Sequence, residues 1–177
     1  MIAFIQARID SKRLPKKVLY KIQKETIIEI IHKRLKKSKY ISKNIFIIPN
    51  DKKNLILEKK LKYLRYEYFK GSNLNVLKRY YDAAKYYGSE NLIRITSDCP
   101  LIDSTIIDKM ILVFKKNNLD YLSNNNPPSF PHGLDVEIIR FDSLKNAYMN
   151  AKSLRDKEHV TYYITRNKKK FKIKNYK

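Results

Sequence analysis

The chain has 177 residues, with 39 lysines and arginines against 17 aspartates and glutamates, and its formal net charge is +22. This length fits one domain with a substantial core, and no apolar run approaches the roughly 20 residues of a membrane helix. The N-terminus lacks the pattern of a secretory signal peptide. The single cysteine, Cys99, excludes an internal disulfide and fits a reducing compartment without requiring one. With no membrane helix or signal peptide predicted, we expect a cytoplasmic protein without a membrane partner.

The positive charge has two interpretations. It could mark a nucleic-acid-binding protein, because neutralisation of phosphates drives such binding. It could also reflect a lysine-rich composition in which lysine fills surface positions. The basic residues are spread from Lys12 to Lys177 with no dense block before the tail. We therefore favour the compositional explanation and do not expect nucleic acid as a partner.

The first predicted element is a short buried strand over residues 2–5, followed by a strongly basic loop. In an open α/β sheet, ligands bind at the carboxyl ends of the strands, where this loop begins. Arginine forks and mobile lysine ammonium groups together can hold a triphosphate. The alternative is an ordinary solvated loop in a lysine-rich protein. The cations of this loop are Arg8, Lys12, Arg13, Lys16 and Lys17.

Strands and helices alternate along the rest of the chain. Ser72 or Asn73 is expected to cap a helix that Gly88 closes, and Ser104 to cap another. The remaining predicted strands cover residues 44–48, 64–69, 91–96, 120–123, 134–139 and 171–173, and the remaining predicted helices cover 25–37, 52–60, 142–151 and 156–167. This alternation predicts a single domain with a three-layer α/β fold and a mostly parallel sheet.

Two common nucleotide-binding motifs are absent from the sequence. It contains neither GxGxxG nor GxxxxGK[ST], and it has only three glycines. Dinucleotide binding of the Rossmann type and P-loop ATPase chemistry are therefore not expected.

Carboxylates that follow predicted strands are candidate metal ligands. Asp98 follows the strand at 91–96, so it should lie at the same sheet edge as the basic loop, where Mg²⁺ could bridge it to phosphates. The alternative is a capping aspartate before Pro100. Asp135 and Glu137 lie two apart on a predicted strand and should face the same way. They suit a second metal contact or sugar hydroxyls, or they belong to a solvated strand face.

Several ordered motifs resemble those of the sugar cytidylyltransferases, which include the acylneuraminate and Kdo enzymes, and most closely the spore coat polysaccharide type. The first motif combines Gln6-Ala7-Arg8, Ser11, Arg13-Leu14-Pro15 and Lys17-Val18-Leu19, and later motifs lie at 69–77, 94–103, 133–137 and 158–161. Two positions depart from the family pattern. Lys16 replaces a usual glycine, and Lys24-Glu25-Thr26 stands where a Gly-Lys-Pro turn is common.

The resemblance implies a Rossmann-like nucleotide-diphospho-sugar transferase fold, also called GT-A. It also implies transfer of CMP from CTP to an acidic or keto sugar for surface polysaccharide biosynthesis, with Mg²⁺ as cofactor and a homodimer as a possible assembly. The implied catalytic residues are Arg13, Lys17 and Asp98. The implied nucleotide contacts are Gln6, Ala7, Arg8, Arg13, Lys17, Gly71 and Ser72. The implied sugar contacts are His132, Asp135, Glu137 and His159, and the implied metal ligands are Asp98 and Asp135.

The C-terminus departs from the family, whose members usually continue into a segment with further acidic residues. This chain has no carboxylate after Glu158. Three explanations stay open: the chain is shortened, Asp135 or Glu137 takes the missing role, or the protein is a weakly catalytic relative that acts as a nucleotide-binding or interaction module.

Overall fold

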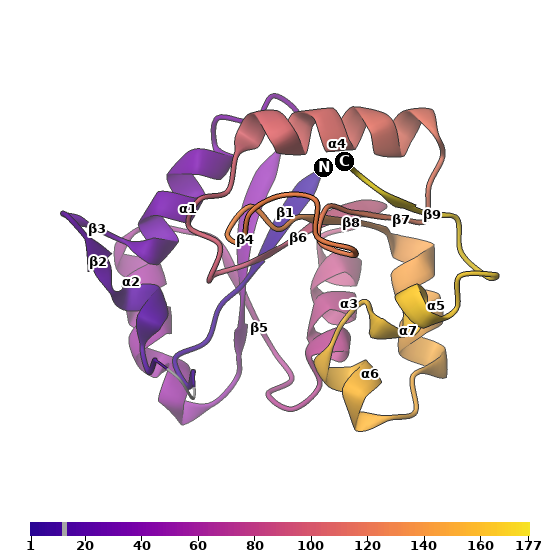
Figure 1. Ribbon diagram of the computed structural model, residues 1–177. Helices are drawn as coiled ribbons and strands as arrows, with labels where there is room; N and C mark the ends of the chain where they lie inside the picture. Colours follow the sequence, from indigo (N-terminus) through magenta and orange to yellow (C-terminus); the bar gives the residue numbers. More distant parts are fainter. Residues whose placement is uncertain (12–13) are drawn as a thin grey trace.

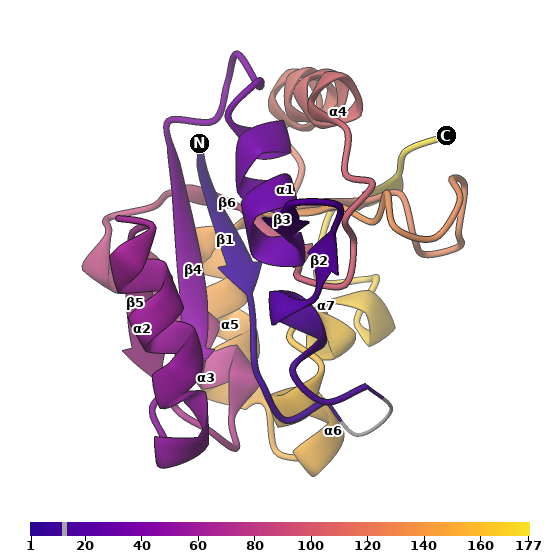
Figure 2. The same cartoon turned by 90° about the vertical axis from the view of Figure 1, so that its left-hand side faces the viewer.

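The computed structural model describes residues 1–11 and 14–177, and it places a seven-stranded sheet between two layers of helices (Figures 1 and 2). The strand order is β5-β4-β1-β6-β8-β7-β9, and β2 and β3 form a separate ribbon. The main-sheet strands are β1 (Ile2–Gln6), β4 (Lys43–Pro49), β5 (Tyr68–Gly71), β6 (Asn91–Thr96), β7 (Tyr121–Ser123), β8 (Glu137–Arg140) and β9 (Ile173–Asn175); the ribbon strands are β2 (Lys21–Ile22) and β3 (Glu25–Thr26).

Each face of the sheet is covered by helices whose apolar residues define a separate core cluster. Helices on one face are α1 (Ile27–Leu35), α2 (Leu55–Tyr63) and α4 (Ser104–Lys116); those on the other are α3 (Val76–Tyr86), α5 (Phe141–Asn150) and α7 (Tyr162–Arg166). The short α6 (Leu154–Glu158) precedes α7, and single 3-10 turns occur at Lys17–Leu19 and Lys52–Asn54. Strand β1 alternates between the clusters, with Ala3 and Ile5 in the first and Phe4 in the second. The expected three-layer, mostly parallel α/β fold is confirmed.

Strand directions bring distant segments to one edge of the sheet. Strands β4, β1 and β6 run parallel, whereas β8 runs antiparallel to both β6 and β7. The carboxyl ends of β1, β6 and β7 therefore share an edge with the start of β8. Arg94 of β6 and Glu137 of β8 are direct register partners. The basic loop after β1, the turn after β6 and the β7–β8 connection consequently meet at this edge, where ligands bind in open α/β sheets.

Most predicted elements are present, and the strand at 91–96 matches β6 residue for residue. Several boundaries were wrong. Glu25 and Thr26 form β3 rather than helix, and β5 begins only at Tyr68, because Arg65 adopts a left-handed conformation with φ 56. Strand β8 begins at Glu137, so Asp135 precedes the strand instead of lying on it. The predicted helix at 156–167 is two short helices separated at 159–161, and β9 starts two residues later than expected.

The predicted caps of α3 and α4 also require correction. Asn75, not Ser72 or Asn73, caps α3: its side chain accepts a hydrogen bond from the Lys78 N–H at 2.8 Å. Asp103, not Ser104, caps α4, by accepting from the N–H groups of Thr105 and Ile106. Gly88 follows α3 with φ +60, as a helix-closing glycine does.

The structure describes no helix with the length and apolar character needed to cross a membrane.

Candidate active site

An ion pair joins two loops at the carboxyl edge of the sheet. Lys17, after β1, places its Nζ 2.8 Å from Oδ2 of Asp98, after β6. Burial would raise the pKa of Asp98, but hydrogen bonds from Lys17 and Thr96 and the lysine charge outweigh it and hold that pKa below its ordinary value. Both residues line two neighbouring cavities, here named cavity A and cavity B. The pair therefore stands in the wall that the cavities share.

Cavity B measures about 400 Å³ and is lined by Arg8 and Lys17, two of the cations expected to bind phosphate. Arg8 is half exposed, and its only described ion pair is a long one of 3.8 Å to Asp10. Together with Lys17 it gives cavity B two cationic side chains that could contact an anion. The complete lining is Gln6, Arg8, Ser11, Lys17, Thr96, Ser97, Asp98 and Glu158.

Cavity A, of about 620 Å³, has several carboxylates in its wall. Asp135 lies on the β7–β8 connection, where its Oδ2 accepts from Cys99 Sγ at 3.5 Å and from the Gly133 N–H at 3.4 Å, and His132 Nδ1 lies 3.9 Å away. Burial raises the pKa of Cys99 to about 11, so its thiol stays protonated and is no nucleophile. The full lining is Lys17, Arg94, Thr96, Asp98, Cys99, Asn125, His132, Gly133, Asp135 and Glu137.

The donor groups of cavity A fit a hard divalent cation. Asp98 and Asp135 both line it, and Mg²⁺ typically takes one or two carboxylates together with substrate phosphates. Within residues 1–11 and 14–177, no group of three or more histidine, cysteine, aspartate or glutamate side chains could form an all-protein metal cage. Asp98 and Asp135 are therefore the two residues of cavity A that could contribute carboxylates to Mg²⁺.

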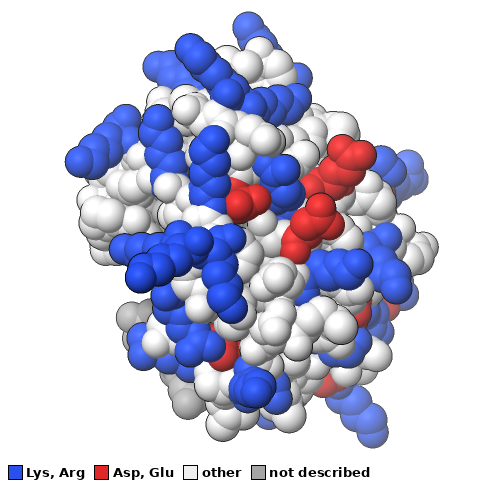
Figure 3. Space-filling model, turned by 90° about the vertical axis from the view of Figure 1, so that its right-hand side faces the viewer, with Lys and Arg blue, Asp and Glu red and all other residues white. Residues whose placement is uncertain are grey.

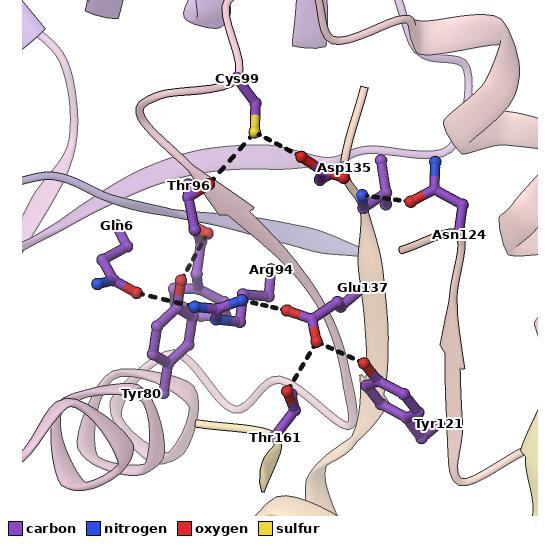
Figure 4. A network of polar contacts seen from close by, with 12 residues as sticks. Gln6, Tyr80, Arg94, Thr96, Cys99, Tyr121, Asn124, Asp135, Glu137 and Thr161 are labelled. Atoms are coloured by element: carbon purple, nitrogen blue, oxygen red, sulfur yellow. Dashed lines mark hydrogen bonds and ion pairs between the residues drawn. The ribbon is translucent and has the colours of Figure 1, made fainter. Parts of the chain in front are cut away.

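Glu137 occupies a different environment from the one expected (Figure 4). It is 4% exposed, and both carboxylate oxygens already have partners: Oε2 accepts from Arg94, and Oε1 accepts from Tyr121 and, at 2.7 Å, from Thr161. Burial would raise the pKa of Glu137, but the Arg94 charge and these hydrogen bonds keep it below its ordinary value. Glu137 lines cavity A, but its carboxylate is paired with Arg94, and both of its oxygens already accept hydrogen bonds.

A third cavity, cavity C, measures about 330 Å³ and shares Arg94, Asn125 and Glu137 with cavity A. His159 lines cavity C, whereas the adjacent Glu158 lines cavity B. The guanidinium of Arg155 lies 4.3 Å from the centre of the Tyr162 ring, and both side chains also line cavity C. Cavities A and C therefore adjoin at these three residues, and the two together are here called the depression.

Other expected site residues lie outside these cavities. Ala7 is buried, and its N–H donates to the Ile47 carbonyl at 3.2 Å. Gly71 packs so closely on the buried Arg79 that an added Cβ would lie 2.7 Å from Arg79 Cγ, and the Ser72 carbonyl accepts from Arg79 Nε. Gly71 and Ser72 thus contact Arg79 and do not line cavities A to C. Arg13 lies outside the described residues.

Sequence reasoning missed several wall residues, among them Arg94, Arg155 and Glu158. Arg94 had a detectable signal, because a lone arginine within the apolar strand Asn91–Thr96 needs a buried partner. Glu158 had no signal beyond its place in a family motif.

Lysine and arginine side chains cover much of the face drawn in Figure 3, with few carboxylates among them. The basic side chains are scattered over this face instead of forming one stripe. Such a distribution agrees with the compositional explanation of the net charge and favours anionic small molecules near the surface.

Comparison with known proteins decides the family, because the sequence matches the cytidylyltransferase family over residues 2–177. The chain belongs to the cytidylyltransferases. The spore coat polysaccharide biosynthesis protein SpsF of Bacillus subtilis is 30% identical over 174 residues, which cover 93% of this chain and 69% of SpsF. This family membership confirms the resemblance found in the sequence motifs.

Solved structures of similar proteins agree with the architecture. A cytidylyltransferase from Leptospira borgpetersenii is 33% identical with a TM-score of 0.93, and the match covers 99% of this chain and 74% of that one. A CMP:2-keto-3-deoxy-manno-octonic acid synthetase complexed with CTP has a TM-score of 0.78 at 13% identity, covering 99% of this chain and 88% of that one. At that identity the second likeness shows the fold alone, which is the nucleotide-sugar transferase type expected.

Proposed function

We propose that this cytidylyltransferase moves CMP from CTP to a hydroxyl of an acidic or keto sugar and releases pyrophosphate, in the biosynthesis of a surface polysaccharide. The observation that carries the proposal is the Lys17–Asp98 pair in the wall between cavity A and cavity B. One cavity supplies cations for a nucleotide and the other supplies carboxylates for a metal and an acceptor. The two reactants would meet at that wall, so catalysis would rest on positioning and charge stabilisation.

Cavity B would hold CTP. Arg8 and Lys17 would bind the triphosphate, as would Arg13 by its place in the family motif, while Gln6 and Ser11 would contact the nucleoside. Lys17 would exchange its bond to Asp98 for one to phosphate, because a triphosphate carries more negative charge than one carboxylate. This exchange would free Asp98 at the moment when the nucleotide arrives.

Asp98 and Asp135 would hold Mg²⁺, since both line the cavity next to the proposed triphosphate site. A magnesium ion supplies charge neutralisation on the phosphates and on the pyrophosphate leaving group. Asp135 is held by the Gly133 N–H and the Cys99 thiol, which limit the rotation of its side chain. The site would form fully only with nucleotide present.

The sugar would bind in cavity A with its anionic substituent directed into cavity C. Cavity C adds Arg155 and His159 to the shared lining, so it is the more basic end of the depression. The reacting hydroxyl would then face Lys17 and Asp98. Its oxygen would form a bond to the α-phosphorus, the bond from that phosphorus to the bridging oxygen would break, and the hydroxyl proton would pass to solvent.

A weakly catalytic nucleotide-binding module is the second candidate function. The absence of a third metal-ligating carboxylate beside Asp98 and Asp135, within the described part of the chain, favours it. Pyrophosphate release separates the two candidates. We expect release from CTP with Mg²⁺ and a keto sugar acid such as 3-deoxy-manno-octulosonic acid or N-acetylneuraminic acid. CTP binding without release from a panel of acidic and neutral sugars would favour the binding module.

A further inference from the structure

The carboxylate of Glu137 is a buried junction between three parts of the fold (Figure 4). Arg94 reaches it from β6, Tyr121 from β7, and Thr161 from the start of α7. A buried carboxylate with three donors is strongly fixed, because moving a donor would remove a hydrogen bond from a buried, charged group. Two of these three connections lead to residues that line cavity B.

The first connection runs through Arg94 to Gln6. Nη1 of Arg94 bonds Glu137, while Nη2 donates to Oε1 of Gln6 at 3.2 Å. Beneath the guanidinium lies the ring of Tyr80, whose centre is 5.6 Å from Arg94 Cζ. The rigid fork of the arginine therefore transmits the position of Glu137 to a wall residue of cavity B.

The second connection runs through Thr161 to the junction between α6 and α7. Thr161 precedes the first residue of α7, but its side chain makes no capping hydrogen bond. Its hydroxyl instead donates to Glu137 Oε1 at 2.7 Å. Glu158, three residues earlier at the end of α6, lines cavity B. Together with the packing of the buried Val160, this bond ties the segment that carries Glu158 to the central sheet.

We propose that Glu137 is a positioning residue for the nucleotide cavity and not a metal ligand or sugar contact. It holds Gln6 through Arg94 and the Glu158 segment through Thr161, so one buried carboxylate sets two parts of the wall of cavity B. The proposal rests on the proposed function in one respect: cavity B is taken to be the CTP site.

Two conservative variants test this role. Thr161→Val and Tyr121→Phe each remove one hydrogen bond to the same oxygen of Glu137. Thr161 leads to the Glu158 segment, whereas Tyr121 lies on β7, which contributes no residue to the lining of cavity B. We expect Thr161→Val to weaken CTP binding by roughly three- to tenfold, the effect of one lost hydrogen bond, and Tyr121→Phe to stay within twofold of the wild type.

A third variant tests the other connection. Arg94→Lys keeps the charge but cannot bond Glu137 and Gln6 with one fork, so CTP affinity should fall here as well. Urea unfolding of all variants shows whether they differ in stability alone. Equal losses of CTP affinity in Thr161→Val and Tyr121→Phe, or no loss in Thr161→Val and Arg94→Lys, would overturn the positioning role.

Hydrogen exchange supplies a readout that needs no nucleotide. We expect Thr161→Val, but not Tyr121→Phe, to accelerate exchange of the backbone amides at 158–162 in the free protein. If the wild type fails to bind CTP, the proposed function is wrong, and this comparison alone decides whether Glu137 holds the Glu158 segment. Unchanged exchange in Thr161→Val would then refute the inference.

Discussion

Nζ of Lys17 and Oδ2 of Asp98 lie 2.8 Å apart although the two residues are 81 positions apart in the chain. They meet because β1 and β6 are parallel neighbours, so the loops that follow them leave the sheet at the same edge. This pair stands in the wall between cavity B, which Arg8 also lines, and cavity A, which has several carboxylates. In the free protein each charge satisfies the other. In the proposed complex Lys17 would instead contact phosphate, and Asp98 would contact the metal.

Replacing Asp98 should separate nucleotide binding from magnesium dependence. In Asp98→Ala, Lys17 is free to contact phosphate, so CTP affinity without Mg²⁺ should stay within a few-fold of the wild type. The strengthening of binding by Mg²⁺ should disappear, and turnover should fall by roughly 100-fold, as when one group that stabilises transition-state charge is lost. Titration with and without Mg²⁺ measures both effects. Asp82→Ala, which removes a surface pair with Lys78 on α3, is the matched control. Magnesium dependence that survives in Asp98→Ala would remove Asp98 from the metal site.

Lys16 is a strained position that glycine should relieve. Its φ of 60 is left-handed, a conformation that costs a side-chain-bearing residue about 1–2 kcal/mol, and the family usually has glycine there. Lys16→Gly should therefore raise the free energy of unfolding by about 0.5–1 kcal/mol in urea titrations. Lys21→Gly, in the extended backbone of β2, is the control and should lower it. Destabilisation by Lys16→Gly would mean that contacts of the lysine side chain outweigh the strain.

Arg155 should contribute to the binding of a negatively charged acceptor sugar. If the anionic substituent of the sugar lies in cavity C, Arg155→Ala should raise the KM for a sugar acid by about fivefold, because a partly exposed charged hydrogen bond is lost. CTP affinity should not change, since Arg155 does not line cavity B. Lys152→Ala supplies a control, because this exposed lysine of the same segment lines none of cavities A to C. An unchanged KM for the sugar acid would place the anionic group elsewhere.

His32 should make the stability of the fold depend on pH. His32 is 8% exposed, and its ring stacks on the Tyr66 ring with 3.8 Å between the ring centres. Burial, and then the charge of Lys36, lower the pKa of His32 to about 4, whereas an unfolded histidine ionises near pH 6.5. Protonation therefore favours the unfolded chain: this contribution is complete above pH 6.5 and is lost as pH falls towards 4.

The measurement is urea unfolding of the wild type and His32→Phe at several pH values. Between pH 7 and pH 4 the wild type should lose on the order of 2 kcal/mol more than the variant, because only the wild type must keep a buried histidine neutral. The same carboxylates titrate in both proteins, so their contribution cancels in the difference between the two free energies of unfolding. Parallel pH profiles would show that His32 is not held neutral in the fold.

Sequence patterns predicted the fold class well because each strand and helix carries its own periodicity. The strand at 91–96, the Lys17 loop and the position of Asp98 all follow from local signals. The direction of β8 does not, because nothing in residues 137–140 states whether the strand runs parallel or antiparallel to β6. That direction places Glu137 opposite Arg94, so that Glu137 is buried in an ion pair while Asp135 keeps a more open carboxylate in cavity A.

Cap positions and helix breaks could not be predicted from local sequence patterns either. Ser72, Asn73 and Asn75 are all good capping residues within four positions, and the choice of Asn75 depends on where β5 ends and where Arg79 packs. At the break at 159–161, Thr161 bonds Glu137, which lies 24 residues away in the chain, and no local pattern shows that contact. Such details depend on contacts between residues that are distant in the chain, and these contacts are known only once the folded structure is known.

The measurement that tests the central claim most directly is isothermal titration of the protein with CTP, with and without Mg²⁺, using ATP as the comparison ligand. We expect saturable binding of CTP that Mg²⁺ strengthens, and much weaker binding of ATP. No binding of CTP, or equal binding of both nucleotides, would contradict the assignment of cavity B as a CTP site.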